Sequence, residues 1–484
     1  MRKKLRIEGV AAPEEARGEY VYVPFEVPPG ARRIEVNYHY ENQVVGAQEF
    51  NPGNNIDIGV FDVRGHDFLY GGFRGWSGGA RSAFYITPDA ATPGYLRGPL
   101  QPGEWTIMFG LSKIEEPSRY RVNVEMDIDP NADTAADPGD VPVPGGDVLR
   151  EAVAGGSNGN GAGRWYRGDL HAHSEHSDGA NTVEEIVDYV HRAGLDYFAL
   201  TDHNTISHWD DLARLQQRGG PTLLIAGEEI TMYTGHANVW GLDGWIDFRG
   251  TDAERVQRLI EHANQRGSMF SINHPDSPIP WKHNGVHGYQ AVEVWNAPWR
   301  YYNEPALIRW QYQLNSGQRM VAVGGSDSHC VPPAQMTQPN GPGEPCTWVW
   351  VEGPLTQKAV LDAVAAGRVF ISEAPNGPML DLRADADGDG VFELLPGDVF
   401  QPTRGQKVRF HVKYRGPDGK HLRFFNRRGL ERDIIAESED FDDEFELRCD
   451  GDEYLRVECR GFRGRPDRGE VVHALTNPIY WGKW

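Results

Sequence analysis

The sequence predicts an α/β fold in which a distorted (β/α)7-type barrel is flanked by two β-sandwich domains. Between residues 165 and 375, apolar runs of strand length alternate with amphipathic runs of helix length. On either side, short runs rich in Val, Tyr and Phe are separated by Gly, Pro and Asn, which is typical of sheets joined by turns. Clusters of His, Asp and Glu follow several of the central apolar runs, where barrels gather their functional groups.

The N-terminal β-sandwich is expected over residues 1–130. Its clearest strands are predicted at 20–27, 33–38 and 120–126, and no long helical periodicity interrupts them. The next segment, residues 131–164, is rich in Gly and Pro and predicts a linker.

The barrel is expected over residues 165–375. Its first helix should begin after Thr182, because threonine is a favourable N-cap and apolar residues recur at helical spacing beyond it. The order of strands and helices favours a parallel sheet. Strands are predicted at 167–173, 196–201, 222–231, 237–242, 268–273, 290–295, 320–324, 347–351 and 369–372, and further helices at 207–218, 253–266, 304–316 and 356–366.

After residue 375 the β-type runs return, and they predict the C-terminal β-sandwich over residues 376–484. Within it, Asp385, Asp387 and Asp389 have the oxygen spacing of a Ca²⁺ loop, although Pro396 stands where an EF-hand requires Glu. An acidic hairpin turn is the alternative interpretation.

Length and charge narrow the class of protein. At 484 residues the chain is long enough for roughly three domains of about 150 residues each. Its net charge of −22 would repel a phosphate backbone, so we expect no nucleic acid partner. No continuous apolar segment follows the basic N-terminus, so neither a signal peptide nor a membrane partner is expected. Four widely spaced cysteines argue against a disulfide framework and favour the cytoplasm.

The clusters after the central runs predict a polynuclear metal centre. His171 and His173 are two residues apart on a predicted strand, so both rings face the same side. Glu229 is the candidate for bridging two ions, and Glu228 should point to the opposite face. Each His alone could equally be a hydrogen-bonded core or surface residue, but their recurrence along the alternating segment favours ligands for Zn²⁺, Mn²⁺ or Fe²⁺. The candidate ligands are His171, His173, Asp178, His203, Glu229, His236, His274, Asp327 and His329.

The clusters form the motifs His-x-His-Ser-x-x-Ser-Asp-Gly, Leu-Thr-Asp-His-Asn, Gly-x-Glu-Ile-Thr, Asn-His-Pro and Gly-Ser-Asp-Ser-His. In combination they resemble the PHP family, the polymerase and histidinol phosphatase group of metal-dependent phosphoesterases in the amidohydrolase superfamily. The resemblance covers about 165–375. Two runs in the first segment, Phe73–Gly79 and Tyr95–Pro99, further resemble the CehA/McbA-type branch, which includes a carbamate hydrolase.

The resemblance implies two to three divalent ions. A hydroxide bridging two of them would attack phosphorus or a carbonyl carbon. His176 or His208 is a hypothetical acid that would protonate the leaving oxygen. In similar three-metal sites the first ion would take His171, His173, Glu229 and Asp327, the second would share Glu229 and add His236 and His274, and the third would take Asp178, His203 and His329.

The leading function is a phosphoesterase that acts on a small phosphomonoester or phosphodiester. Lys282 and Arg300 in the late barrel loops are expected to contact this small-molecule ester, as are Arg74 and Trp76 if the first sandwich reaches over the barrel mouth. Hydrolysis of a carbamate or carboxylic ester at the same site is one alternative. A non-catalytic protein that binds carbohydrate or protein and keeps a relict barrel is another, which the completeness of the ligand set disfavours.

Overall fold

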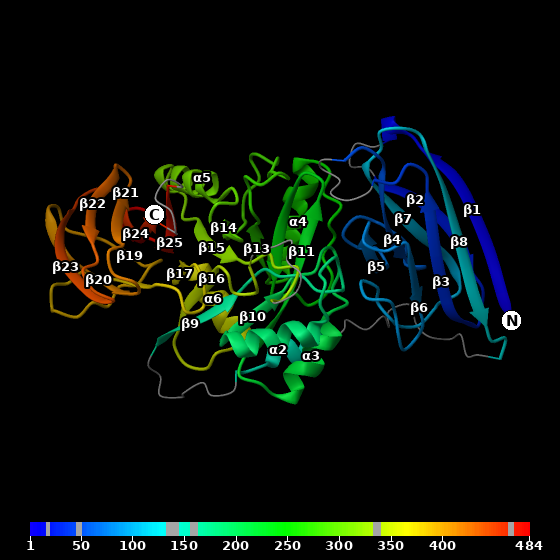
Figure 1. Cartoon of the computed structure of the whole chain (residues 1–484), viewed down its shortest axis with the longest axis horizontal. Helices are drawn as coiled ribbons and strands as arrows, with labels where there is room; N and C mark the ends of the chain where they lie inside the picture. The colour runs from blue at the N-terminus through cyan, green and yellow to red at the C-terminus, as the bar shows by residue number, and fades with distance from the viewer. Residues whose placement is uncertain (16–19, 45–50, 132–144, 155–162, 333–339, 463–468) are drawn as a thin grey trace.

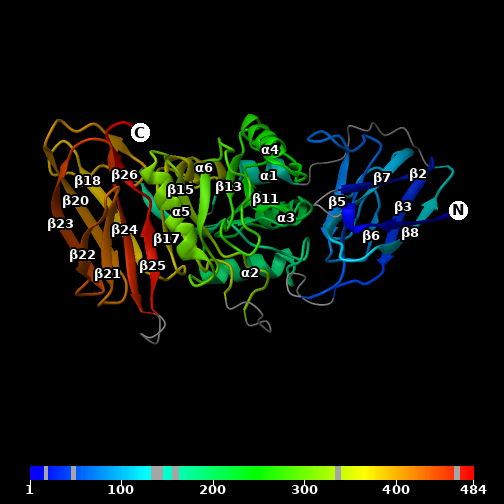
Figure 2. The same cartoon turned by 90° about the horizontal axis from the view of Figure 1, so that it is seen from above.

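The computed structural model describes residues 1–15, 20–44, 51–131, 145–154, 163–332, 340–462 and 469–484. Figures 1 and 2 show three parts in a row: N-terminal strands at one end, a central part of strands and helices, and C-terminal strands at the other end. Within the described ranges, no helix combines the length and apolar character needed to cross a membrane.

Two four-stranded antiparallel sheets form the N-terminal part. Their elements are β1 (Arg2–Ala11), η1 (Pro13–Glu15), β2 (Tyr20–Val27), β3 (Ala31–Tyr40), β4 (Asn55–Phe61), β5 (Phe73–Gly78), β6 (Ala83–Ile86), β7 (Gly103–Lys113) and β8 (Ser118–Ile128). The strand orders are β1-β8-β3-β6 and β2-β7-β4-β5. Burial alternates along β3, as expected for a strand with one apolar face, and buried residues of both sheets form one hydrophobic cluster.

A long mixed sheet forms the central part. Its strands here are β9 (Arg164–Asp169), β10 (Tyr197–Leu200), β11 (Leu223–Met232), β12 (Gly235–Trp240), β13 (Met269–Ile272), β14 (Ala291–Asn296), β15 (Val321–Gly325), β16 (Cys346–Val351) and β17 (Val369–Ser372). Strand β10 pairs in parallel with β9 and β11, and β14 pairs in parallel with β13 and β15. The predicted parallel sheet is therefore correct for these two runs of three strands. The two-residue connection between β11 and β12 permits only antiparallel pairing.

Among the described strands no sheet closes as a barrel, so the predicted distorted (β/α)7-type barrel is not confirmed. Closure would need β15 to pair with β16 or β17, but side chains occupy the β15 edge instead. Thr347 Oγ1 accepts from Gly324 N at 2.9 Å and donates to Gly324 O at 2.7 Å. Asn477 accepts from Ala322 N and donates to Ala322 O, both at 2.8 Å. These side chains satisfy backbone groups that closure would otherwise pair.

Helices lie where the periodicity predicts them: α2 (Val183–Ala193), α3 (Trp209–Arg218), α4 (Ala253–Gln265), α5 (Asn303–Asn315) and α6 (Gln357–Ala366). Thr182 caps α2 as predicted, because its hydroxyl accepts from Glu185 N at 3.2 Å while the Glu185 carboxylate accepts from Thr182 N at 3.0 Å. The apolar residues at helical spacing in α2 are buried.

One short helix lies within the predicted linker. It is α1 (Gly146–Glu151), which packs against α3 and buries Leu149 in the main hydrophobic cluster. This part of the segment is therefore anchored on the central part. The predicted linker residues 132–144 and 155–162 lie outside the described residues.

The C-terminal part continues the central sheet without a break at residue 375. Its strands are β18 (Met379–Asp385), β19 (Val399–Phe400), β20 (Gln406–Arg415), β21 (His421–Asn426), β22 (Gly429–Ile435), β23 (Asp440–Cys449), β24 (Glu453–Phe462), β25 (Glu470–Thr476) and β26 (Ile479–Trp481). The long sheet runs from β17 through β25, β24 and β21 to β22, whereas β18, β20 and β23 form a separate sheet. Buried residues of both sheets form one hydrophobic cluster.

Candidate metal centre

The structure brings all nine candidate ligands together. Most follow strands of the parallel runs, whose carboxyl ends meet at one edge: His171 and His173 follow β9, His203 follows β10, and His274 follows β13. Ligand atoms within 4.8 Å of one another form four groups, which share members: His171, His173 and Glu229; His171, His274 and Asp327; Glu229, His236 and His274; and His173, Asp178, His203 and His329.

Glu229, on β11, lies at the centre of these groups. Its fully buried carboxylate is 3.3 Å from His171 Nε2, 3.3 Å from His236 Nδ1 and 3.4 Å from His274 Nε2. His203 Nδ1 lies 2.6 Å from its second oxygen. His173 Nε2 lies 3.7 Å from the same oxygen, so five imidazoles surround one carboxylate, which is the arrangement expected around a bridging ligand.

His171 and His173 point their Nε2 atoms at a common place. The two Nε2 atoms are 3.2 Å apart. Asp327 Oδ1 lies 2.9 Å from His173 Nε2 and 3.4 Å from His171 Nε2. Both rings thus lie on one side, as predicted, although β9 ends at Asp169 and the predicted strand over 167–173 does not reach these residues.

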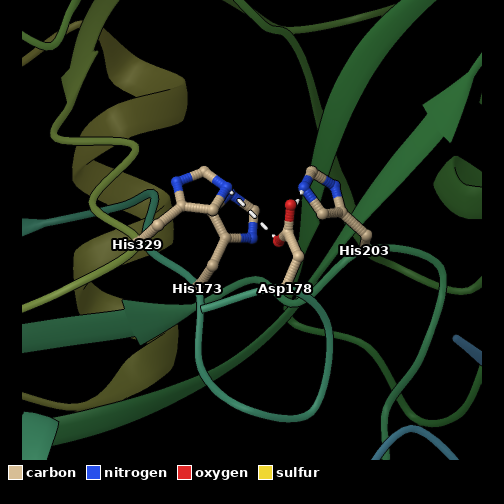
Figure 3. Close-up of side chains that lie close together, drawn as sticks. All are labelled: His173, Asp178, His203 and His329. Atoms are coloured by element: carbon tan, nitrogen blue, oxygen red, sulfur yellow. Dashed lines mark ion pairs between the residues drawn. The ribbon is translucent and has the colours of Figure 1, made fainter. Parts of the chain in front are cut away.

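A third set of side chains lies on loops. Figure 3 shows His173, Asp178, His203 and His329 pointing toward one another. Asp178 Oδ1 is 3.4 Å from His203 Nε2 and 3.3 Å from His329 Nε2. One carboxylate and three imidazoles therefore face a shared space.

The charges of this cluster fit divalent cations. Every ion pair of Asp178, Glu229 and Asp327 among the described residues is with a histidine, and none is with Lys or Arg. Burial lowers the pKa of His171, but the carboxylates, Glu293 first, outweigh it and hold that pKa well above its usual range. Imidazolium thus supplies positive charge that metal ions would supply after displacing the proton.

Glu293, on β14, is a functional residue that the sequence reasoning missed. Its Oε1 lies 2.8 Å from His171 Nδ1, and its Oε2 accepts from His274 N at 3.0 Å. Because a carboxylate accepts, Nδ1 of His171 carries a hydrogen, and Nε2 would offer its lone pair to a metal ion that displaces the second proton. The signal in the sequence was that Glu293 is the one charged residue in the otherwise apolar run before Asn296. The Asn296 amide also donates to Glu293 and to Asp327.

The cluster opens into a cavity of about 410 Å³. Tyr301 and Tyr302 line it, and about half of each tyrosine is exposed. No Lys or Arg is among the described residues of its wall. The other wall residues are Ser277, Pro278, Ile279, Asn296, Ala297 and Asn340, together with His203, Glu229, His236, His274, Asp327 and His329.

The structure directs both candidate acids elsewhere. His176 Nδ1 lies 2.8 Å from Ser207 Oγ, and its ring lines a different cavity, beside Arg97. His208 is fully buried, with Nδ1 3.2 Å from Asp202 Oδ2. Neither ring lines the cavity of the metal cluster, so the predicted acid role is corrected for both.

Arg74 and Trp76 are structural and do not cover the cavity. The buried Arg74 guanidinium donates to backbone carbonyls within residues 96–99 at 2.9–3.3 Å, and these hydrogen bonds hold that turn. Trp76 is buried against Phe248, with ring centroids 4.9 Å apart. The predicted substrate contacts of both residues are therefore wrong.

Lys282 and Arg300 are exposed, but neither lines the cavity of the metal cluster. The cavity wall next to Arg300 is made by the two tyrosines that follow it. The predicted anion contacts of Lys282 and Arg300 are therefore not formed in this structure.

Residues 385–390 form an acidic turn. Asp385 pairs with Arg409 and accepts from Gly388 N and Gly390 N, while Asp389 accepts from Val391 N. Carboxylate oxygens of Asp385, Asp387 and Glu393 lie within 4.8 Å of one another, but Asp389 does not belong to this group. Since backbone N–H groups and Arg409 engage these carboxylates, the acidic turn is favoured over the predicted Ca²⁺ loop.

Glu228, by contrast, points away from the cluster as predicted. Its Oε2 accepts from Ile246 N at 3.0 Å, and burial raises its pKa well above the usual range. It therefore belongs to the interior and is not one of the ligand candidates that face the cluster.

Two solved structures are similar to this chain. A two-domain protein from Bacteroides vulgatus, described as containing a predicted PHP-like metal-dependent phosphoesterase, is 18% identical with a TM-score of 0.38; the match covers 67% of this chain and 98% of that one. An amidohydrolase from Chromobacterium violaceum is 15% identical with a TM-score of 0.24, over 36% of this chain and 92% of that one. No curated protein matches the chain.

The PHP domain family matches residues 169–277. This range holds most of the candidate ligands, and Asp327 and His329 lie beyond it. The chain therefore contains a PHP domain, and its candidate metal centre is built partly from residues that follow the matched range.

Proposed function

We propose that the protein is a metal-dependent hydrolase, most directly a phosphoesterase acting on a small phosphomonoester or phosphodiester. One observation carries the proposal: six histidines and three carboxylates cluster together, and four of these histidines line a cavity of about 410 Å³ together with Glu229 and Asp327. Buried carboxylates surrounded by imidazoles rather than by Lys or Arg are the donor set that binds transition-metal ions. The PHP domain match over most of these residues supports the same proposal.

In this proposal the ligand groups would hold three ions. His171, His173, Glu229 and Asp327 would hold the first. The second would share Glu229, and the third would lie among the loop ligands of Figure 3. Bound Mn²⁺, Zn²⁺ or Fe²⁺ would supply Lewis acidity and a water of lowered pKa. Membership of the CehA/McbA-type branch is part of this proposal.

The chain's own residues orient the site. Glu293 fixes the hydrogen of His171 on Nδ1, and Asn273 donates to Glu229 Oε1 at 2.8 Å. Tyr301 and Tyr302 would hold the organic part of a substrate against the cluster. The tyrosines would place the ester bond beside the ligand groups and would limit the access of bulk water to it.

A second candidate is hydrolysis of a carbamate or carboxylic ester. The cavity wall favours it because the described residues there include two tyrosines but no Lys or Arg. Phosphate sites built by proteins commonly use Arg to hold the anion. A neutral ester needs no such cation, and an apolar wall suits its organic groups.

Parallel assays of the Mn²⁺-loaded and Zn²⁺-loaded protein on an aryl phosphomonoester, a phosphodiester and a carbamate test the proposal. The expected result is metal-dependent turnover of a phosphate ester that Glu229→Gln abolishes and Glu228→Gln leaves intact. Turnover of the carbamate alone would favour the second candidate. A protein fully loaded with metal but inert on every activated ester would contradict both and revive the non-catalytic interpretation.

A further inference from the structure

The N-terminal part contacts the ligand loops through the turn of residues 92–97 and through Arg81, which donates to Pro93 O at 3.2 Å and to Glu175 O. Gly94 N donates to Ser207 Oγ at 2.9 Å, and Gly94 O accepts from Thr205 Oγ1 at 2.9 Å. Thr205 and Ser207 are buried and lie in the loop that carries His203. These hydrogen bonds therefore join the N-terminal part directly to a loop that holds a candidate ligand.

Ser207 connects this contact to a second ligand loop. Its hydroxyl lies 2.8 Å from His176 Nδ1, and His176 N donates to Ser174 Oγ at 3.1 Å. Ser174 Oγ in turn donates to Asp202 Oδ2 at 2.6 Å. A continuous chain of buried hydrogen bonds thus ties the loop before Asp178 to the residue before His203.

The turn fits closely enough that only glycine is accommodated at position 94. Gly94 has φ of +96°, which L residues rarely adopt. A Cβ atom there would lie 2.7 Å from Trp76 O and 3.0 Å from His176 O. The backbone of the N-terminal part therefore packs directly against the loop that leads to Asp178.

The loops concerned need such support more than the rest of the site does. Glu229 and His236 lie within the paired strands β11 and β12, and the Glu229 side chain is fully buried. Asp178 and His203 lie on loops, with side chains 48% and 20% exposed. No strand pairing holds Asp178, so its position depends on tertiary contacts. His203 is tied to β11 by one isolated β-bridge, in which Asn204 N donates to Glu229 O at 2.9 Å and Glu229 N donates to Asp202 O at 3.3 Å.

We propose that the turn at 92–97 is part of the scaffold of the third ligand group. Ion binding by Asp178, His203 and His329 then depends on the N-terminal part of the chain. Gly94, Thr205 and Ser207 are positioning residues, since they hold the loops and do not touch the ion. The inference rests on the proposed metal-dependent function.

Matched variants of the full chain separate this role from general stability. Thr205→Val keeps the shape of the side chain but removes its hydrogen bond to Gly94, whereas Thr205→Ser keeps the hydroxyl. Gly94→Ala pushes the turn away from the loop. Arg97→Ala is the control, because the exposed Arg97–Asp210 ion pair lies at the same contact and outside the hydrogen-bond chain.

The readout is binding of Mn²⁺ alone, measured by elemental analysis and by competition with a chelator. Thr205→Val and Gly94→Ala are expected to weaken the most weakly bound ion by about tenfold or more, the typical cost of disturbing groups that orient metal ligands. The remaining ions should keep their affinity. Thr205→Ser and Arg97→Ala should match the wild type in every ion.

Thr205→Val with wild-type affinity for every ion would overturn the inference, and so would equal loss of all ions. If Gly94→Ala does not fold, the comparison of Thr205→Val with Thr205→Ser decides. A wild-type protein that binds no divalent ion would instead refute the proposed function, so the two failures are distinguishable.

Discussion

Replacing Glu293 by Gln is expected to weaken metal binding without disturbing the fold. One carboxylate oxygen accepts from His171 Nδ1 at 2.8 Å and the other from His274 N at 3.0 Å. Gln has the same shape, but one of these positions becomes an NH₂ donor. If it faces His171, the imidazole must move its hydrogen to Nε2 and lose the lone pair that would bind an ion. If it faces His274, the backbone N–H loses its acceptor.

Loss of such an orienting group costs about 10- to 100-fold in metal affinity, which is about 1.4 to 2.7 kcal/mol. The assay is competition between the protein and a chromogenic chelator for Mn²⁺ at constant pH. Because His171 belongs to two of the ligand groups, the loss of affinity should appear for the ions held by those two groups and not for the ion held by the group of Asp178.

Glu228→Gln is the matched control. Glu228 lies next to Glu229, is equally buried, and faces away from the cluster. Since burial already keeps it protonated, an amide replaces it with little change in charge. If Glu293→Gln bound Mn²⁺ like the wild type, or if Glu228→Gln lost affinity to the same extent, the orienting role of Glu293 would be refuted.

Three further predictions concern stability. Burial raises the pKa of Asp57 to about 6, so the stability that its neutral form contributes is present below pH 3.8 and is lost as pH rises through 6. Asp57→Asn should therefore raise the free energy of unfolding by up to about 3 kcal/mol at pH 7. Equal denaturation midpoints at pH 4 and pH 7 in both proteins would contradict this prediction. Thr182→Ala should cost about 1 kcal/mol locally, seen as faster amide exchange across α2. Chelation should lower the thermal midpoint, and Mn²⁺ at about 100 times its Kd should restore about 2.7 kcal/mol; an unchanged midpoint would count against a metal site.

The candidate ligands could be predicted because their signal is local. His171 and His173 show their common side through spacing alone, and polar residues after apolar runs mark the ends of strands. Glu293 could not be assigned in this way. Its role depends on a long-range contact with His171, because four strands separate β14 from β9 in the sheet.

Closeness in sequence was a poor guide to orientation. His176 is two residues from Asp178, yet its ring turns to Ser207, because the N-terminal turn at Gly94 organises that side of the loop. Arg74 looked available for a substrate anion, but nearby carbonyl groups engage its guanidinium. In both cases a partner distant in sequence sets the direction of the side chain: the Ser207 hydroxyl for His176, and the carbonyl groups of Leu96 and Pro99 for Arg74.

The open edge of the central sheet has the same kind of cause. Alternation of strands and helices favours a distorted barrel, but it contains no information about how strands that come later in the chain pair with the sheet. Here β25 pairs with β17, and Asn477, just after β25, occupies the backbone groups of Ala322 on β15. Strand β15 leads directly to Asp327 and His329. The C-terminal part therefore supports the strand that delivers these two ligands, while the N-terminal turn supports the loops of Asp178 and His203.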